Sequence, residues 1–480
     1  MKRTISGALL AALLSTATAT GATAQTPTGM MGPLRPDQAE FRGLYKELVE
    51  TNTALSSGSC TQASAQIAAR LRVAGMPDGQ ITLFSTPEHP KEGGIVAVYP
   101  GTSKKLKPIL LVAHLDVVEA KREDWTRDPF KLIEEDGYFY GRGTFDDKGQ
   151  AAVWADTLIR FQQQGYKPAR TVKMALTCGE ESSVPFNGVA WLTQNRRELI
   201  DAEFALNEGG GGRTATRGGP VVVQTIQVGE KSGQNFRIEA TNIGGHSSIP
   251  IRDNAIYQLA DALVRVRAHE FPVVLSDTTR VFFSQAGKAR GGAMGAAMQA
   301  IAANPGDAAA VAELDKDSTF HSMLRTTCVA TLLDGGHAVN ALPQRAGALI
   351  NCRIFPGETT EAVRLALIKA IADPGISVTL MPPVRPVAPP PPLDPSVIGP
   401  MQQVAARHYP GVPILPTMST GGTDAKYLGN AGIPTYGAPG IWADADLNGI
   451  HGLNERLEVR SLYKGRDYLF DLVKAYAGGK

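Results

Sequence analysis

The sequence predicts an α/β fold: a mostly parallel sheet with helices on both faces, into which a smaller α+β domain is inserted. Long apolar stretches such as KPILLVAHLDVV alternate with amphipathic helical stretches over the first half of the chain. Strands that are apolar along nearly their whole length are covered on both faces, which is typical of parallel sheets. Near Lys231 the pattern changes to alternating strands and helices, which indicates a compact inserted α+β unit.

The main domain is expected at residues 36–230 and 386–480, on either side of an insert at residues 231–385. Before the insert, stretches with apolar residues at the 3.6-residue spacing of a helix alternate with stretches that are continuously apolar, as buried strands are. Strands are expected in GGIVAVYP, KPILLVAHLDVV, RTVKMALTC and AEFALNEGG, and helices in QAEFRGLYKELVETNTA, GQAAVWADTLIRFQQQG and GVAWLTQNRREL.

The insert contains the expected strands QNFRIEATN, GALINCRIFP and ISVTLMP and the expected helices NAIYQLADALVRVRAHE and TEAVRLALIKAIAD. Residues 285–313 are rich in Ala and Gly and predict a small helical excursion. The run PPVRPVAPPPPLDP is too stiff and too poor in donors for a helix or a central strand, so it predicts a rigid return linker. After it, PSVIGPMQQVAARHY, IPTYG and LYKGRDYLFDLVKAYAG resume the alternation of the main domain.

Composition places the chain among ordinary globular proteins. Of its 480 residues 43% are hydrophobic, enough for a large core and at least two domains. The net charge of +2 comes from 48 basic and 46 acidic residues in mixed order, without a basic block. Nucleic acid and anionic membrane surfaces are therefore not expected partners.

Residues 1–24 predict a secretory signal peptide. Lys2 and Arg3 precede the apolar run ISGALLAALLSTA, and small residues allow cleavage after Ala24. The run is shorter than the roughly 20 apolar residues of a membrane-spanning helix. We therefore expect a secreted, periplasmic protein without a stable membrane span; a short uncleaved anchor is the alternative.

The four cysteines, Cys60, Cys178, Cys328 and Cys352, contain no CxxC pair. Buried free thiols are the expectation, and one disulfide in an oxidising compartment is the alternative.

Five segments place ligand-type side chains at the ends of expected strands or before a helix. Each alone has a plain interpretation, as a polar loop residue or as a helix cap. All five together, on one sheet, favour a metal site. They are His114 and Asp116 in LVAHLDVV, Asp146 in YGRGTFDDKGQ, Glu180 and Glu181 in LTCGEES, Glu208 in FALNEGG, and His451 in NGIHGLNERL.

Imidazole and carboxylate ligands of this number predict two zinc ions, although Co²⁺ and Mn²⁺ fit the same ligands. Two zinc ions would also relieve the repulsion between the adjacent carboxylates of Glu180 and Glu181. Such a pair of ions acidifies water for attack on an amide carbonyl. Glu180, beside ligand Glu181 but itself unbound, would act as general base. His114 and Asp116 are two residues apart on one strand, which suits a ligand and the carboxylate that orients it.

The order of these motifs resembles the M20 metallopeptidases: HxD, a GRGTFDDKG turn, a Glu-Glu pair, Glu before glycines, and a late His. This resemblance implies that Asp146 bridges two metals and that Asp147 is a neighbour. It also implies that His114 and Glu208 complete one metal site, whereas Glu181 and His451 complete the other.

The resemblance also implies that the insert is a ferredoxin-like lid that mediates homodimerisation. His246 in NIGGHSSIP would reach an active site, often that of the partner, although a loop or capping role is its plain alternative. Asn340 and Arg353 would hold the substrate's carbonyl and carboxylate. Gly422 and Thr423, within STGGTDAKYL, would line the substrate site. The remaining histidines are expected to be structural or solvent-facing: His89, His269, His321, His337 and His408.

The main functional hypothesis is an exported dinuclear zinc metallopeptidase that cleaves an amide bond in a peptide or dipeptide with a free carboxylate. An N-acyl amino acid amidohydrolase is the first alternative. A binding protein that has lost activity on the same fold is the second, and the complete ligand set argues against it.

Overall fold

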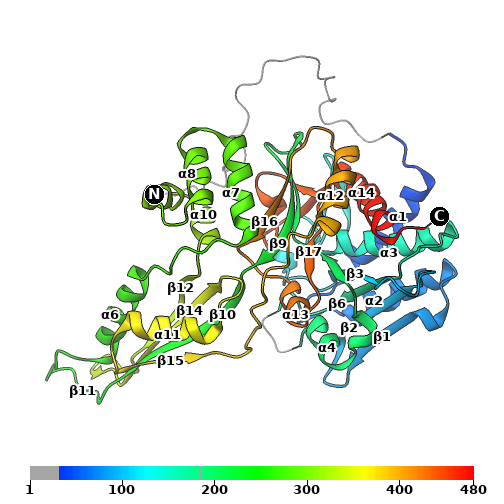
Figure 1. Cartoon of the computed structure of the whole chain (residues 1–480). Helices are drawn as coiled ribbons and strands as arrows, with labels where there is room; N and C mark the ends of the chain where they lie inside the picture. The colour runs from blue at the N-terminus through cyan, green and yellow to red at the C-terminus, as the bar shows by residue number, and fades with distance from the viewer. Residues whose placement is uncertain (1–31, 183–185, 480) are drawn as a thin grey trace.

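The computed structural model describes residues 32–182 and 186–479. Within them, a large sheet forms the main domain and a smaller one forms the insert, at the lower left of Figure 1. The large sheet has the order β1-β2-β6-β3-β7-β17-β9-β8-β18, and β16 also pairs with β9. Its strands are β1 (Ile81–Thr86), β2 (His89–Tyr99), β3 (Ile109–His114), β6 (Val172–Thr177), β7 (Phe204–Asn207), β8 (Gly210–Thr214), β9 (Val221–Glu230), β16 (Ile414–Ser419), β17 (Thr435–Gly437) and β18 (Trp442–Ala443).

The centre of this sheet is parallel, because β6, β3, β7 and β17 pair in one direction, whereas β1 and β2 add antiparallel strands at one edge. Every residue of β3 and β6 is buried, as their continuous apolar patterns predict. The predicted α/β fold class is confirmed. The carboxyl ends of the parallel strands meet at one edge, where ligands of such sheets bind.

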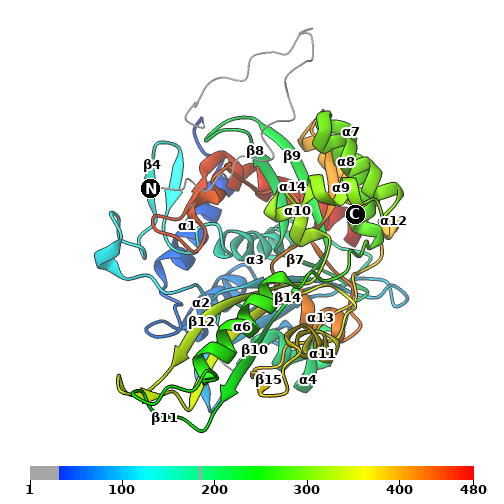
Figure 2. The ribbon, with the colours of Figure 1, turned by 90° about the vertical axis from the view of Figure 1, so that its left-hand side faces the viewer.

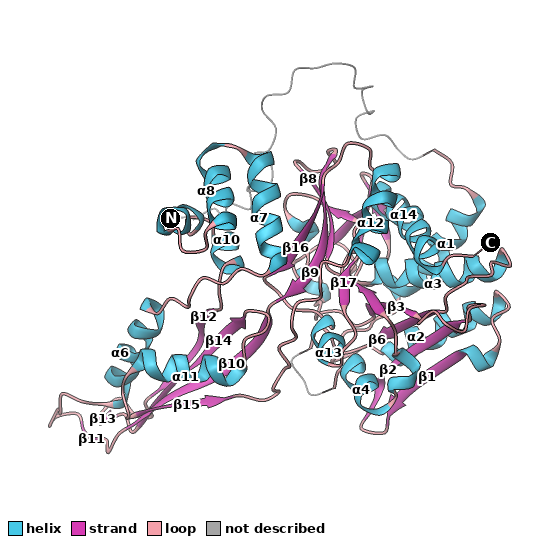
Figure 3. Ribbon diagram, viewed as in Figure 1, coloured by secondary structure: helices cyan, strands magenta, loops and turns pink. Residues whose placement is uncertain are grey.

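Helices cover both faces of the large sheet (Figure 3). Successive residues of β3 alternate between two cores: Leu111 packs into the first, and Leu110 and Val112 into the second. The first core is covered by α1 (Pro36–Glu50), α2 (Cys60–Val73), α3 (Lys148–Gln163), α12 (Pro395–His408) and α14 (Val459–Ala477). The second is covered by α4 (Gly188–Asn195), α5 (Arg197–Ile200) and α13 (Ala425–Asn430).

The insert has a β-α-β-β-α-β order with an antiparallel sheet in the order β12-β14-β10-β15, which is the ferredoxin-like topology. Its elements are β10 (Ser232–Thr241), α6 (Ala255–Ala268), β12 (Thr327–Gly335), β14 (Arg345–Ile354), α11 (Thr360–Ile371) and β15 (Ile376–Leu380). Residues of α6 and α11 pack on the sheet and form a core of their own. A short ladder of β11 (Gly245–His246) and β13 (Ala341–Leu342) lies at the far tip of the insert (Figure 2).

The helical excursion is larger than residues 285–313. It comprises α7 (Asp277–Arg290), α8 (Gly292–Ala303), α9 (Ala308–Leu314) and α10 (Ser318–Met323). Phe283 and Phe320, on either side of the Ala- and Gly-rich part, pack with Met298 and Ile301 from within it, and Met418 of β16 joins this core. Aromatic side chains outside the small-residue stretch therefore complete the core of this unit.

A three-stranded sheet joins the two parts of the main domain, before and after the insert: β4 (Ile133–Glu135), β5 (Tyr138–Tyr140) and β19 (Arg456–Glu458), in the order β19-β5-β4. Short 3-10 turns complete the described chain: η2 (Asp78–Gln80), η3 (Arg122–Asp124) and η4 (Leu447–Gly449). No helix in the described part is long and apolar enough to cross a membrane. The expected signal peptide lies outside the described residues.

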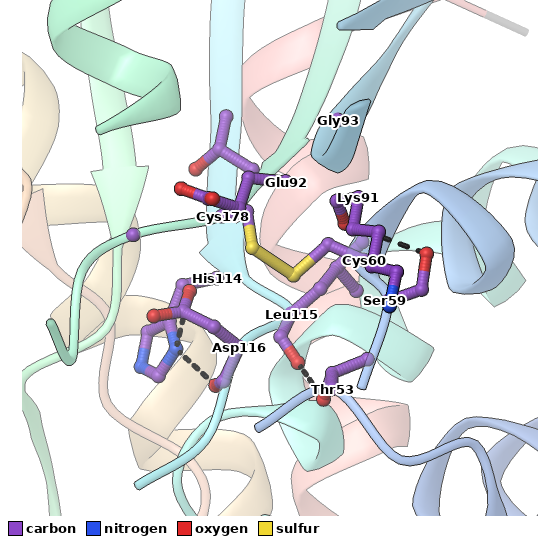
Figure 4. Close-up of a disulfide and its surroundings, with 12 residues drawn as sticks. Thr53, Ser59, Cys60, Lys91, Glu92, Gly93, His114, Leu115, Asp116 and Cys178 are labelled. Atoms are coloured by element: carbon purple, nitrogen blue, oxygen red, sulfur yellow. Dashed lines mark hydrogen bonds and ion pairs between the residues drawn. A yellow bond between two sulfur atoms is a disulfide. The ribbon is translucent and has the colours of Figure 1, made fainter. Parts of the chain in front are cut away.

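The prediction of free thiols is wrong. Cys60 forms a disulfide with Cys178 (Figure 4), and Cys328 forms one with Cys352. Cys60 begins α2 and Cys178 directly follows β6, so the fold brings together two residues that are 118 positions apart. Cys328 and Cys352 are direct cross-strand partners on β12 and β14. Neither proximity is visible as a sequence spacing.

Candidate metal centre

Two histidines and three carboxylates converge at the carboxyl edge of the large sheet. His114 ends β3, Glu181 follows β6, and Glu208 follows β7. Because these strands are parallel neighbours, their ends place the three side chains together. Asp146 comes from the turn before α3, and His451 comes from the loop before β19. Residues as far apart in the sequence as His114 and His451 thus meet at one point of the fold.

Asp146 lies between the two histidines. Its Oδ1 is 3.0 Å from His114 Nε2, and its Oδ2 is 3.2 Å from His451 Nε2. His114 Nε2 also lies 3.8 Å from a Glu208 oxygen, and His451 Nε2 lies 2.9 Å from Glu181 Oε1. One oxygen of Asp146 faces each ligand pair, which is the arrangement that a carboxylate bridging two metals requires. The donor atoms of His114, Asp146 and Glu181 all lie within 4.8 Å of one another.

The electrostatics of the site also fit bound cations. Burial raises the pKa of Glu208 well above its ordinary value and also raises the pKa of Glu181. Burial alone would lower the pKa of His114, but the charges of Glu208, Asp146 and Asp116 raise it well above its ordinary value. The carboxylates repel one another and draw protons to the histidines, so divalent cations would relieve the excess negative charge.

His451 is the more exposed of the two histidines. Hydrogen bonds to Asp146 and Glu181 raise its pKa to about 10. Burial alone would raise the pKa of Asp146, but hydrogen bonds from His114 and His451 lower it below its ordinary value. Because a metal ligand must be a neutral imidazole, metal binding at this site requires His451 to lose a proton.

Asp147 is buried beside the ligands but belongs to none of the candidate metal groups found among the described residues. It occupies the N-cap position of α3, which begins at Lys148, yet its side chain makes no capping hydrogen bond. The plain interpretation of the DDKG turn as an Asp cap therefore does not apply here.

Asp116 contacts His114 differently from the sequence expectation. β3 ends at His114, so Asp116 lies beyond the strand. His114 Nδ1 donates to the main-chain carbonyl of Asp116 at 2.9 Å, whereas the nearest carboxylate oxygen lies at 3.7 Å. The Asp116 carboxylate instead accepts from the backbone amides of Glu180 at 3.4 Å and Glu181 at 2.9 Å. It therefore fixes the Glu-Glu pair directly.

Glu180 is nearly enclosed beside the ligands. Its closest cation is Lys426, whose Nζ lies 3.7 Å from Oε1. Burial raises the pKa of Glu180 to about 8, against the opposing charge of Lys426. One carboxylate oxygen of Glu180 also lies within 4.8 Å of a ring nitrogen of His114 and of a carboxylate oxygen of Glu208. A carboxylate with a raised pKa beside a metal site is suited to accept and return a proton near neutral pH.

Glu455 is a structural residue of the site that is not among the residues expected from the sequence. It is completely buried and accepts backbone hydrogen bonds from Gly143 at 3.0 Å, Phe145 at 2.9 Å and Asp146 at 3.1 Å. It also pairs with Arg142 at 2.8 Å. One carboxylate thus shapes the turn that carries Asp146. Its position four residues after His451, in NGIHGLNERL, was the available signal.

The loop that contains Gly422 and Thr423 is anchored by Glu230, at the end of β9. Glu230 accepts from the Thr423 amide at 2.9 Å, the Thr423 hydroxyl at 2.7 Å and the Lys426 amide at 3.1 Å. A side chain at Gly422 would meet the main-chain oxygen of Lys231 at 2.7 Å, so only glycine fits this approach. The loop therefore delivers Lys426 to Glu180.

The structure separates the substrate residues expected in the insert. Arg353 lies at the end of β14 that joins the main domain, and its charge interacts with that of Glu180. His246 is exposed on β11, and Asn340 is exposed directly before β13, where its carbonyl accepts from the Ser247 amide. A ten-residue strand such as β14 is about 30 Å long. His246 and Asn340, at its far end, are remote from the metal ligands of their own chain (Figure 1).

A cavity of about 280 Å³ lies beside Asp116 and Glu181. Leu55, Val117 and Val118 give it an apolar wall, and Cys178 of the disulfide lines it as well. Its size suits an apolar side chain or a short acyl group next to the metal ligands.

The chain matches peptidase family M20/M25/M40 over residues 110–475. It is 27% identical over 393 residues to the probable carboxypeptidase S-like 2 of Dictyostelium discoideum, an alignment that covers 79% of this chain and 74% of the relative. It is 28% identical over 403 residues to the human N-fatty-acyl-amino acid synthase/hydrolase PM20D1, an alignment that covers 82% of this chain and 79% of that protein. Its fold matches the M20 family metallo-carboxypeptidase Sso-CP2 of Sulfolobus solfataricus with a TM-score of 0.68 at 18% identity, over 92% of this chain and 100% of that chain.

Proposed function

The chain belongs to peptidase family M20/M25/M40, and we propose that it is an exported dinuclear zinc enzyme that hydrolyses an amide bond in a peptide or dipeptide with a free carboxylate. Its class as a metallopeptidase or amidohydrolase follows from the family and confirms the resemblance inferred from the motifs. The substrate, the identity of the metal and export are the parts that we propose.

One observation carries the proposal: Asp146 offers one oxygen to each of two histidine-carboxylate pairs, with Glu180 beside them. His114 and Glu208 would hold one ion, Glu181 and His451 would hold the other, and Asp146 would bridge them. Imidazole and carboxylate ligands suit Zn²⁺, and Co²⁺ or Mn²⁺ would fit the same ligands. Asp116 and Glu455 hold the ligand segments in place, because their carboxylates accept from the backbone amides of Glu181 and Asp146, respectively.

The bound ions would supply Lewis acidity for the scissile carbonyl and for water. Glu180 accepts the proton of the attacking water and returns it to the leaving nitrogen, for which a pKa raised by burial is suited. Lys426, 3.7 Å away, stabilises the ionised form of Glu180 before it accepts the proton and again after it has returned it. Asp116 keeps the base in place by accepting from the Glu180 backbone amide.

Arg353 and the cavity of about 280 Å³ define the two ends of the substrate in this proposal. Arg353 is exposed, its charge interacts with that of Glu180, and it binds the carboxylate of the leaving amino acid. The apolar wall of Leu55, Val117 and Val118 receives the acyl side. An N-acyl amino acid is the second candidate substrate, because it would place its acyl group against the same wall and because one relative is an N-fatty-acyl-amino acid hydrolase.

We also propose a homodimer formed through the insert. β12 is an edge strand whose Val329, Leu332 and Leu333 are 59%, 65% and 69% exposed, and Tyr257 and Val264 of the neighbouring α6 are exposed too. An exposed apolar edge strand favours pairing with a second copy. A partner would also explain how His246 and Asn340, remote from their own metal ligands, reach a substrate: they would serve the partner's site.

Export and periplasmic localisation are supported by the predicted signal peptide and by the two disulfides, which persist in oxidising compartments. Cell fractionation of the full chain, with the mature N-terminus determined by mass spectrometry, tests this. Cleavage after Ala24 is the expected result, and protein retained in the cytoplasm at full length would overturn it.

The central experiment compares wild type with Glu180→Gln on a panel of dipeptides and N-acyl amino acids, with metal content measured for both proteins. We expect about two zinc ions per chain in each, because Glu180 is not one of the proposed ligands, and loss of hydrolysis in the variant only. Removal of metal by a chelator should abolish activity, and Zn²⁺ should restore it. A metal-free active enzyme, or a Glu180→Gln protein with wild-type turnover, would overturn the mechanism.

A further inference from the structure

Arg353 lies on the open face of the insert sheet, directly opposite Gly233 of β10. Its guanidinium lies over the glycine, because a Cβ at residue 233 would stand 3.2 Å from Arg353 Nη1. The absence of a side chain at this position therefore lets the guanidinium lie flat near the start of β10.

The return linker passes the same short stretch of β10. The amide of Arg385 donates to the side-chain oxygen of Gln234 at 3.1 Å, and the Ser232 hydroxyl donates to the carbonyl of Pro386 at 2.8 Å. Arg385 is thus held beside residues 232–234, the stretch over which the Arg353 guanidinium lies. Two arginines that are 32 positions apart in sequence thus lie along the same short stretch of β10, at the junction of the insert and the main domain.

Arg353 and Arg385 have no counter-ion among the residues that the structure describes. Within the described part of the chain, neither guanidinium has a hydrogen bond or an ion pair. Partial burial and the charge of Arg385 lower the pKa of Arg353, whereas Glu180 raises it. Arg385 also acts on Tyr427, whose pKa is influenced by Glu180 as well. Both positive charges are therefore close to the catalytic end of the main domain.

The nearby carboxylates are engaged by other groups. Glu230 accepts from Thr423 and Lys426, Asp424 accepts from Asn187 at 2.6 Å, and Glu180 has Lys426 as its closest cation. Two like charges held together without an anion repel each other, and a carboxylate placed between them would relieve this repulsion through charge-assisted hydrogen bonds. The junction thus has the charge of an anion site that a ligand completes.

We infer that Arg385 is a specificity-determining residue, which together with Arg353 holds the carboxylate of the leaving amino acid between two guanidiniums. This inference rests on the proposed function, since it assigns a second ligand to the carboxylate of the substrate. The proline-rich linker has a direct purpose in this arrangement: its stiffness keeps Arg385 in place beside β10.

The test uses zinc-loaded Glu180→Gln protein, which is expected to bind without turnover, and two probes, N-acetyl-L-phenylalanine and its amide. Calorimetry should show tighter binding of the carboxylate than of the amide. Adding Arg385→Gln should weaken binding of the carboxylate about ten- to hundredfold, the value of hydrogen bonds to a charged group, and leave the amide unchanged. Arg385→Lys should restore only part of the loss, because lysine lacks the planar fork.

Arg407→Gln is the matched control, because it removes the same charge from an exposed position on α12. It should leave both affinities unchanged. In wild-type protein with a substrate that it hydrolyses, Arg385→Gln should raise KM and leave kcat within about threefold, a split that a folding defect would not give.

Equal affinity for the carboxylate and the amide in the parent protein would overturn the inference, as would an unchanged ratio in Arg385→Gln. The proposed function fails separately: if wild type hydrolyses no substrate, yet Arg385→Gln still abolishes the preference for carboxylate, the anion site stands and the catalytic assignment is wrong. Hydrolysis with an unchanged KM in Arg385→Gln would overturn only the role of Arg385.

Discussion

Glu455→Gln tests whether one buried carboxylate shapes the metal site. Glu455 Oε1 accepts from the amides of Phe145 and Asp146, and Oε2 accepts from the amide of Gly143 and from Arg142. Glutamine has the same shape, but one of its ends is an NH₂ group. That end must face two donors, so two of the four hydrogen bonds are lost whichever way the amide points.

The expected cost follows from these contacts. Hydrogen bonds to a charged group contribute about 1.5–3 kcal/mol each, and removing one partner of a buried ion pair costs about 3–5 kcal/mol. We therefore expect Glu455→Gln to lower the unfolding free energy of the main domain by about 3–5 kcal/mol. For a domain of this size, that corresponds to a fall of about 10 °C in Tm. Because the turn also carries Asp146, zinc affinity should fall about 10–100-fold.

The assay is differential scanning calorimetry of the metal-free protein, followed by zinc titration against a chromophoric chelator. Glu134→Gln is the matched control: its ion pair with Arg42 is exposed on both sides, so its loss should cost less than about 1 kcal/mol. A Glu455→Gln protein with a Tm within 1 °C of wild type and an unchanged zinc affinity would refute the reasoning.

Three further predictions concern protons, subunits and the disulfide at the site. The apparent zinc affinity should rise with pH, about tenfold per pH unit for each proton released, up to the His451 pKa of about 10. The reason is that the raised pKa keeps this ligand protonated at lower pH. A zinc affinity that does not change from pH 7 to 9 would contradict this prediction. Leu333→Lys on the exposed edge of β12 should convert the dimer to a monomer, as measured by analytical ultracentrifugation. A mixture of His246→Ala protein with Glu180→Gln protein should regain activity. A dimeric Leu333→Lys protein would argue for another interface. The double variant Cys60→Ser/Cys178→Ser should lose about 2–5 kcal/mol of stability, measured by calorimetry, and an unchanged Tm would show that the crosslink is dispensable.

The predicted parts of the site share one physical basis. His114, Glu181 and Glu208 were found because continuous apolar strands indicate a parallel sheet, and the ends of parallel strands gather at one edge. The sequence signal is local in each case: a strand pattern and the polar residue that follows it. The same holds for the insert, whose change of pattern near Lys231 coincides with the start of β10 at Ser232.

The parts that could not be predicted depend on contacts between distant segments. Glu455 reaches the amide of Asp146 across 309 positions, and Cys60 reaches Cys178 across 118. No local pattern distinguishes such residues from an ordinary loop Glu or a buried thiol. Asp116 shows a subtler limit: its partner His114 was identified, but β3 ends two residues before Asp116, and the ring contacts the main-chain carbonyl of Asp116 instead of its carboxylate.

The position of Asp116 beyond the strand explains why two adjacent glutamates can have separate roles. Its main-chain carbonyl accepts from His114 Nδ1, which leaves Nε2 facing the site. Its carboxylate accepts from the backbone amides of both Glu180 and Glu181. The backbone is therefore held in place at both residues, and each side chain starts from a fixed position. Glu181 then meets His451, whereas Glu180 turns toward Lys426. One residue thus holds a ligand of each proposed metal and the base between them, and the repulsion of the pair is met on one side by a histidine and on the other by a lysine.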